Sequence, residues 1–153
     1  MFNFFKRKND FKLVSPVKGQ LINLDKVNDQ VFSSKIMGDG FAVIPEEQII
    51  CSPINGKVMM VFPTKHAIGL KTSDGQDVII HVAVNTVELN GFGFSVFVKE
   101  GDIVKQGQKL VELGNDIFHD SAIDLVTIVV LPNSSNLNLP LFDKSVERGE
   151  GVI

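Results

Sequence analysis

Residues 66–82 read HAIGLKTSDGQDVIIHV, and this stretch decides the fold. Two strand-like runs flank Thr72-Ser73-Asp74-Gly75, whose Asp-Gly pair is a hairpin turn signal. Strands joined by such a turn run antiparallel, so His66 is expected beside His81. His66 lies eight residues before the Asp-Gly pair and His81 six residues after it. Side-by-side placement therefore requires a bulge or an extra residue in the loop.

Other short runs also alternate in polarity with a period of two. They cover residues 20–24, 58–62, 77–82 and 109–113, and Gly, Pro, Asn and Asp bound them. Only residues 116–124, near His119, are typical of a short helix. Many short strands with frequent turns predict an all-β fold, an antiparallel β-sandwich of the barrel-sandwich type with little helix.

An internal repeat supports this interpretation. Ser15-Pro16-Val17-Lys18-Gly19-Gln20-Leu21-Ile22 is echoed by Ser52-Pro53-Ile54-Asn55-Gly56-Lys57-Val58-Met59. The proline is expected to start a strand, where its missing donor does little harm, and the glycine to permit a bend. The repeat predicts duplicated hairpin units in two similar halves that pack face to face.

Length and composition bound the class of protein. The chain has 153 residues, 44% of them apolar, which predicts one domain over residues 11–153 after a flexible segment at 1–10. The net charge of −3 argues against nucleic acid as a partner. The single cysteine favours a reducing, cytoplasmic location. No apolar run is long enough to span a membrane, which leaves at most peripheral membrane contact.

The two histidines are candidates for covalent group transfer. An isolated histidine in a strand is more often structural, but His81 follows the apolar run Val78-Ile79-Ile80, and the Thr64 hydroxyl can hydrogen-bond to His66. No Gly-x-Ser-x-Gly motif completes a hydrolase site. A pair of neutral imidazoles suits reversible transfer: one ring nitrogen is the nucleophile, and a fixed acceptor holds the other. His66 and Thr64 can then stabilise phosphoryl oxygens.

Metal binding is the rival hypothesis. A structural zinc normally takes four protein ligands, and Cys51 and His119 are distant in sequence from the histidine pair. We therefore expect no metal or cofactor within the chain, although His66 and His81 are suited to a zinc shared with a second protein.

Two segments carry a resemblance to a known family: Thr64-x-His66-Ala67 and Ile80-His81-Val82-x-x-x-Thr86-Val87-Glu88-Leu89-x-Gly91-x-Gly93-Phe94. Further matches are Pro16-x-x-Gly19, Val31-Phe32-x-x-Lys35-Ile36-Met37-Gly38-Asp39-Gly40, Pro53-x-x-Gly56 and Glu100-Gly101-Asp102-x-Val104-x-x-Gly107. Together they cover nearly the whole chain. It resembles the glucose-family enzyme IIA of the bacterial phosphoenolpyruvate-dependent sugar phosphotransferase system.

This resemblance implies a phosphotransferase component that works through a phosphohistidine and is not a stand-alone metabolic enzyme. It implies that His81 is phosphorylated, with His66 and Thr64 as its hydrogen-bonding partners. The donor would be the small histidine phosphocarrier protein, and the acceptor an enzyme IIB domain of a sugar permease. The resemblance also implies an apolar rim that docks partners, at Phe32, Met37, Phe62, Ile68, Ile79 and Val87, with Asn85 and Glu88 as its polar members.

The chain departs from the family pattern at two positions. Ala83 stands where glycine is usual, and its methyl group is expected to narrow the approach to His81. Asn85 stands where aspartate is usual, which removes a carboxylate that basic partner residues could meet. These changes keep a second hypothesis open: a regulatory module whose docking to transporters or metabolic enzymes is switched by His81 phosphorylation. A third hypothesis is a biotinyl or lipoyl carrier. It would require an exposed lysine in a tight hairpin, and we find no such lysine in this sequence.

Overall fold

The fold is described from a computed structural model, over residues 12–84 and 92–153. The strands are β1 (Gly19–Asn23), β2 (Asp39–Pro45), β3 (Ile49–Cys51), β4 (Gly56–Val61), β5 (Ala67–Lys71), β6 (Asp77–Val84), β7 (Phe94–Val96), β8 (Ile103–Val104), β9 (Lys109–Leu113), β10 (Asp124–Leu131) and β11 (Asp143–Val146). Three short helical segments accompany them: η1 (Leu24–Lys26), α2 (Gln30–Ser33) and α3 (Asn115–Phe118). No helix in these ranges is long and apolar enough to cross a membrane.

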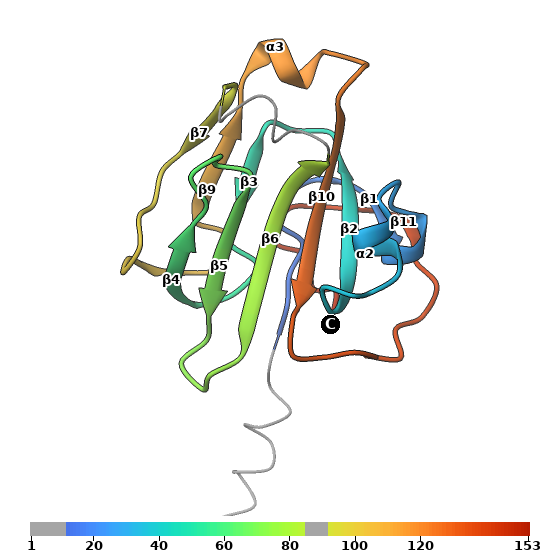
Figure 1. The fold of residues 1–153 in the computed structure, drawn as a ribbon, viewed down its shortest axis with the longest axis vertical. Coiled ribbons are helices and arrows are strands. Elements are labelled where there is room, and N and C mark those ends of the chain that lie inside the picture. Colours follow the sequence, from blue (N-terminus) through green and yellow to red (C-terminus); the bar gives the residue numbers. More distant parts are fainter. Residues whose placement is uncertain (1–11, 85–91) are drawn as a thin grey trace, which may run out of the picture.

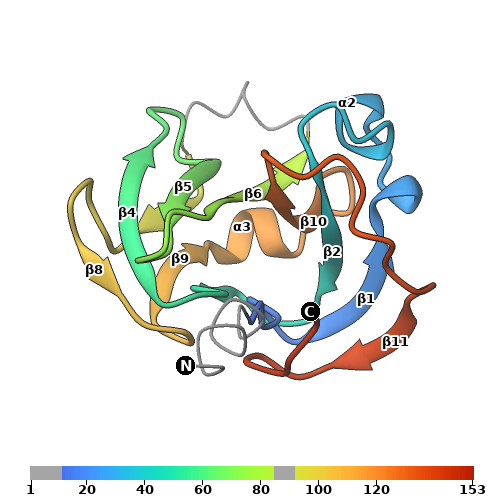
Figure 2. The same cartoon turned by 90° about the horizontal axis from the view of Figure 1, so that it is seen from below.

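The strands form two antiparallel sheets (Figure 1). The larger has the order β11-β1-β2-β10-β6-β5-β4-β8, and the smaller has the order β3-β9-β7. Seen from below, the larger sheet curls from β8 and β4 on one side to β1 and β11 on the other (Figure 2). The predicted all-β antiparallel sandwich with little helix is therefore confirmed.

An inner core lies between the sheets because alternate strand residues point inward. Phe41, Leu70 and Ile80 of the larger sheet share this core with Leu110 and Leu113 of the smaller one, and all are at most 1% exposed. Burial of a side chain of this size stabilises the fold by about 1.5–3 kcal/mol relative to leaving it exposed.

The repeat in the sequence is a repeat in the structure. Ser15 Oγ donates to the Val17 carbonyl, and Ser52 Oγ donates to the Ile54 carbonyl, each at a distance of 2.7 Å. The two copies also bond to each other reciprocally: the Val14 amide donates to the Pro53 carbonyl at 3.1 Å, and the Cys51 amide to the Pro16 carbonyl at 2.8 Å. The duplicated units start side by side and lead into opposite ends of the larger sheet.

The repeated glycines are required by close packing of the backbone. A Cβ at Gly19 would overlap the carbonyl oxygen of Ile44 on the neighbouring strand, and a Cβ at Gly56 would overlap that of Lys71. Each glycine therefore lets its strand approach the next one, where the sequence predicted only a bend.

A second apolar cluster covers part of the opposite face of the larger sheet. Ala42, Ile128 and Val130 point outward there and are buried by Leu24, Val27 and Phe32 from the η1–α2 segment. Figure 1 shows α2 in front of β2. Since this cover stops short of β5, the outer side of the β5–β6 hairpin is left for the candidate site.

Of two further sequence-based expectations, the helix at 116–124 is corrected and the flexible segment at 1–10 cannot be compared with the structure. The helix expected at 116–124 is only the single turn of α3, because the chain leaves the helix after Phe118 and the last of those residues begins β10. An Asp120 side chain that accepts from the Ala122 amide at 2.9 Å stabilises the intervening turn. The flexible segment expected at 1–10 lies outside the described residues.

We expect Gly19→Ala to lower the free energy of unfolding by about 2–3 kcal/mol, because the new methyl group meets a backbone carbonyl that cannot move independently of its sheet. Gly151→Ala is the matched control, since a Cβ there meets nothing within 4 Å and should change stability by about 0.5 kcal/mol or less. Urea denaturation of the two variants tests this. Equal stabilities would show that the strands can separate at no cost.

Candidate functional site

The β5–β6 hairpin places the two histidines together. Ala67 pairs with His81, and the pairing continues without a shift to Lys71 opposite Asp77. The five residues 72–76 form the loop, which supplies the extra residue that the sequence required. The His66 carbonyl accepts from the Val82 amide at 2.7 Å, so the two histidines are diagonal neighbours.

A tight turn brings the His66 ring to the same face as His81. Strict alternation would turn His66 inward with Val82, because Ala67 shares the face of His81. The chain instead turns just before β5: the Lys65 amide donates to the Phe62 carbonyl at 2.8 Å, and Lys65 has a left-handed φ of 63°. The His66 and His81 ring centroids are 4.8 Å apart, at an interplanar angle of 67°.

Aromatic rings enclose the pair. The Phe32 ring centroid lies 4.7 Å from that of His81, and the Phe62 centroid lies 5.7 Å from that of His66. Phe32 comes from α2 and is itself only 5% exposed, so it is part of the outer cluster as well as a wall of the site.

This enclosure keeps His81 neutral. Burial, followed by the neighbouring His66, lowers the pKa of His81 from 6.5 to about 4, against smaller opposing effects of the Ala83 carbonyl and the Asp29 carboxylate. Burial also lowers the pKa of His66. Both rings are therefore uncharged near pH 7, and a neutral imidazole has the lone pair that a nucleophile needs.

The two nitrogens of His81 have different surroundings. Nδ1 is buried and has no hydrogen-bond partner within the described residues, while the backbone of Ala83 acts on the ring as an acceptor that raises its pKa. The ring as a whole is partly exposed, so its accessible edge is the one that carries Nε2. A proton on Nδ1, directed to the Ala83 carbonyl, would leave the Nε2 lone pair facing outward.

Ala83 adopts a conformation that favours glycine. Its φ is 68°, in the left-handed region, and its methyl group is fully buried in the inner core. The expectation that this methyl narrows the approach to His81 is therefore wrong, because the methyl points to the other side of the sheet. The substitution acts on the backbone, where a left-handed alanine costs about 1–2 kcal/mol.

Thr64 and His66 form the hydrogen bond expected from the sequence. The Thr64 hydroxyl and His66 Nδ1 are in direct contact, which fixes the orientation of the ring. When the hydroxyl donates to Nδ1, the His66 proton must lie on Nε2. That nitrogen is then a hydrogen-bond donor for a group bound to His81.

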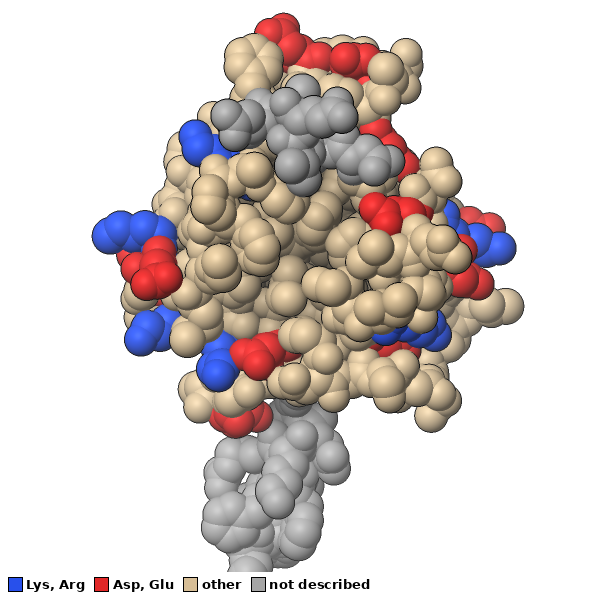
Figure 3. Space-filling view, viewed as in Figure 1, with Lys and Arg blue, Asp and Glu red and all other residues tan. Residues whose placement is uncertain are grey.

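The expected apolar rim is only partly exposed. Met37 is 39% exposed, Phe62 and Ile79 are half-buried, and Val31 and Ile36 of the same segment as Met37 add exposed apolar surface. Figure 3 shows that the centre of this face carries no charged side chains, which lie at its margins. Such a surface favours contact with a protein partner.

One rim residue needs correction, and three cannot be placed. Ile68 pairs with Ile80 and is 1% exposed in the inner core, so it faces away from the histidines and cannot contact a partner. Asn85, Val87 and Glu88 lie outside the described residues.

Sequence reasoning missed Asp29. Its carboxylate accepts from the Val31 amide at 3.0 Å and so caps α2, the helix that carries Phe32. The same negative charge raises the pKa of His81 slightly. An Asn-Asp pair ahead of a short apolar run was the available signal for this cap.

A metal held by this chain alone finds no support in the described ranges. No group of three or more His, Cys, Asp or Glu side chains within residues 12–84 and 92–153 could hold an ion. A zinc on His66 and His81 would need its remaining ligands from a second protein, and it stays a prediction.

Comparison with known proteins supplies the family. Residues 11–137 match the model of the family described as phosphoenolpyruvate-dependent sugar phosphotransferase system, EIIA 1. The chain is 37% identical over 134 residues to the glucose-specific EIIA component of Bacillus cereus, covering 88% of this chain and 81% of that protein. It is 40% identical over 142 residues to the glucoside-specific EIICBA component of Staphylococcus carnosus, covering 92% of this chain but 20% of that protein.

A solved structure agrees with both. The glucose permease IIA from Mycoplasma capricolum superposes with a TM-score of 0.81 at 33% identity, covering 93% of each chain. The fold, the histidine pair and these relatives converge: the chain belongs to the EIIA 1 family, the phosphotransferase components of the phosphoenolpyruvate-dependent sugar phosphotransferase system.

Proposed function

We propose that this chain carries a phosphoryl group on His81 during sugar uptake. It accepts the group from the small histidine phosphocarrier protein and passes it to an enzyme IIB domain. The observation that carries this proposal is the pair of uncharged imidazoles 4.8 Å apart, with Nδ1 of His81 buried and its other edge accessible. The relatives include fused EIICBA proteins, whose names join the IIA part to IIB and IIC parts. We place the relay in the cytoplasm.

The transfer is a displacement at phosphorus. The Nε2 lone pair of His81 forms the new P–N bond while the bond between phosphorus and the donor histidine breaks in line with it. In the second step a cysteine sulfur of the enzyme IIB domain attacks the phosphorus, and the electron pair of the P–N bond returns to Nε2. Because no atom of the protein is otherwise altered, positioning and electrostatic stabilisation supply the catalysis.

The surroundings of His81 suit a temporary carrier. Docking of a partner on the uncharged face excludes water, which would otherwise hydrolyse the phosphohistidine. His66 Nε2–H can donate to a phosphoryl oxygen, and Phe32 and Phe62 restrict the rings without contributing charge.

A regulatory role is the second candidate, and the exposed apolar side chains of Val31, Ile36 and Met37 favour it. A phosphoryl group would add about −2 charge beside this surface. Docking of a transporter or metabolic enzyme on the same apolar face would then weaken. The two roles use one surface and are compatible.

His81→Ala should abolish incorporation of phosphate when the protein is incubated with phosphoenolpyruvate, the first enzyme of the system and the small carrier. Intact-mass measurement of an acid-labile phosphate is the readout. His119→Ala is the matched control, because His119 is an exposed residue at the C-cap of α3 whose ring contacts Phe118 and not the histidine pair. Phosphate on His81→Ala at the wild-type level would contradict the proposal.

His66→Gln should accept phosphate yet pass it to an enzyme IIB domain more slowly, on the order of a hundredfold, because a donor to the phosphoryl oxygens is displaced. Thr64→Val should have a smaller effect, since Thr64 only orients the His66 ring. Single-turnover transfer from the phosphorylated protein measures both rates. A His66→Gln rate equal to that of the wild type would remove His66 from the mechanism.

The His81 ring should titrate near pH 4 when followed by histidine NMR, and His66→Gln should raise that midpoint only modestly, because burial is the larger cause. The sign for stability follows. In the unfolded chain His81 binds a proton below its usual pKa of 6.5, whereas in the folded chain it stays neutral down to about pH 4. The free energy of unfolding therefore falls as the pH drops from 6.5 to about 4. His81→Gln should flatten this dependence. A His81 midpoint near 6.5 would show that the ring is hydrated.

A further inference from the structure

A second hollow lies at the other end of the β4–β5 hairpin, between the start of β4, β8 and the β5–β6 loop. Its volume is about 720 Å³, within the usual size of small-molecule sites. It is lined by Asn55, Gly56, Lys57, Met59, Lys71, Thr72, Ser73, Ile103, Val104 and Lys105. Lys71, the residue of β5 that lines the hollow, lies four residues after Ala67, which pairs with His81. Four residues of extended strand span roughly 13 Å. No residue of the histidine site lines it.

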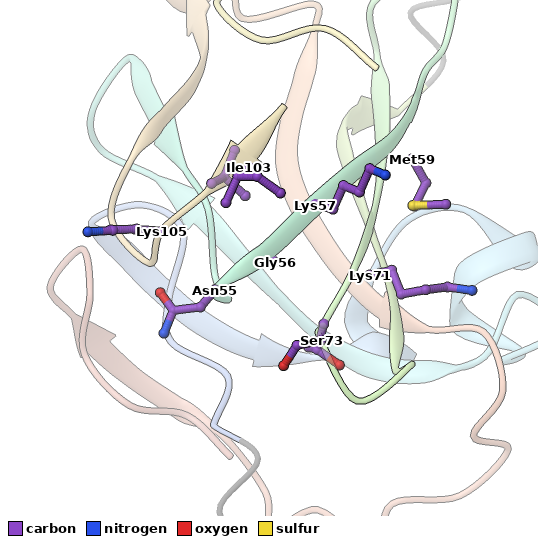
Figure 4. Close-up of a pocket in the computed structure, with 10 residues that line it drawn as sticks. Asn55, Gly56, Lys57, Met59, Lys71, Ser73, Ile103 and Lys105 are labelled. Carbon is purple, nitrogen blue, oxygen red and sulfur yellow. The ribbon is translucent and has the colours of Figure 1, made fainter. Parts of the chain in front are cut away.

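Three lysines surround this hollow in a chain whose net charge is −3. Figure 4 shows Lys105 and Lys71 on opposite flanks, with Lys57 between β8 and Met59. Lys57 and Lys71 are directly opposite each other on paired strands, a placement in which like charges repel. Lys71 has the Asp77 carboxylate at 3.5 Å, whereas Lys57 and Lys105 form no ion pair within the described ranges.

The duplicated unit provides an internal comparison for Lys57. Its equivalent in the first repeat is Gln20, on β1, and Gln20 donates through Nε2 to the Asp143 carboxylate of the neighbouring strand at 2.6 Å. Lys57 instead pairs with Ile103 of β8 on one side and Lys71 of β5 on the other. The same position in the fold thus has its own acceptor at one end of the sheet, and has none among the described residues at the other.

The other groups at the hollow complete an anion site. The Asn55 carbonyl is already used, since it accepts from the Gln106 amide at 2.9 Å, so its NH₂ group is the part left to donate. Ser73 is exposed and presents a hydroxyl group. Met59 and Ile103, which are 42% and 72% exposed, add apolar surface beside these donors. Lys57 and Lys105, which form no ion pair within the described ranges, favour a dianion over a single carboxylate, and the apolar surface favours an attached carbon skeleton.

We propose that this hollow binds a small soluble phosphomonoester, such as a hexose phosphate, with Lys57 and Lys105 on the phosphate and Asn55 and Ser73 on the sugar hydroxyls. The proposal is independent of phosphoryl transfer at His81. Figure 4 shows the Lys57 and Lys105 ammonium groups directed away from each other, but both side chains are flexible and long enough to turn toward a shared phosphate.

The test is a titration of the unphosphorylated chain of residues 1–153, followed by amide NMR, with glucose 6-phosphate, inorganic phosphate and unphosphorylated glucose. We expect glucose 6-phosphate to shift the signals of residues 55–59, 71–73 and 103–105 with a Kd of about 1 mM or tighter. Inorganic phosphate should bind more weakly at the same residues, and glucose should not bind. The affinity for glucose 6-phosphate should fall as salt is added, because salt screens the lysine charges.

Variants distinguish this site from general attraction. Lys57→Gln with Lys105→Gln should weaken glucose 6-phosphate binding by about tenfold or more, because two charge-assisted contacts are lost. Lys144→Gln is the matched control: Lys144 lies on β11, at the other end of the sheet. The amide spectrum of each variant confirms its fold.

A parallel titration uses vesicles that contain phosphatidylglycerol. Three results would overturn the proposal: absence of any shift with glucose 6-phosphate, equal loss of binding in the double variant and the control, or binding only to the vesicles. The last would assign the hollow to a lipid headgroup. Phosphate incorporation at His81 is measured on the same variants. It should be unchanged, which separates failure here from failure of the carrier function.

Discussion

The register of β5 against β6 is the constraint on which the site depends. With Ala67 opposite His81, Ile68 and Ile80 pair on the inner face and fill the core, while His81 remains on the outer face. A shift of one residue would exchange these faces, placing an imidazole in the inner core and an isoleucine at the surface. The register is held from both ends, because the Gln76 amide donates to Thr72 Oγ1 at 2.9 Å and the Val82 amide to the His66 carbonyl.

Burial serves the chemistry of His81 as well as its position. The same burial that lowers the pKa of His81 keeps the ring uncharged near pH 7, so the accessible Nε2 edge retains the lone pair that a nucleophile would need. A phosphoryl group on His81 would replace this uncharged site with a charged one, since it would place a dianion beside Phe32. Strong stabilisation of that dianion would trap it.

Much of this arrangement could be predicted from the sequence, and the failures have physical causes. Alternation and the Asp-Gly turn gave the hairpin, its loop and the histidine pair. The same alternation, applied strictly, would have excluded Ile68 from the rim, because it must face inward with Ile80. It would also have placed His66 wrongly, since the turn at Lys65 that redirects it has no periodic signal. The left-handed φ of Ala83 was missed although the family usually has glycine there, because alanine seldom adopts this conformation.

Duplication explains why the sheet can support two different surfaces. In both copies a buried serine bonds to the second carbonyl after it, and a glycine lets neighbouring backbones meet, so the frame is the same at each end. What differs are the side chains that this frame presents: Gln20 meets Asp143 across β11, whereas Lys57 meets Lys71 and Ile103. Since the frame is fixed by backbone contacts, exposed positions can change at little cost to stability. Lys57, which has no ion-pair partner in the described part of the chain, can therefore persist at one end while the histidine site between the two ends keeps its geometry.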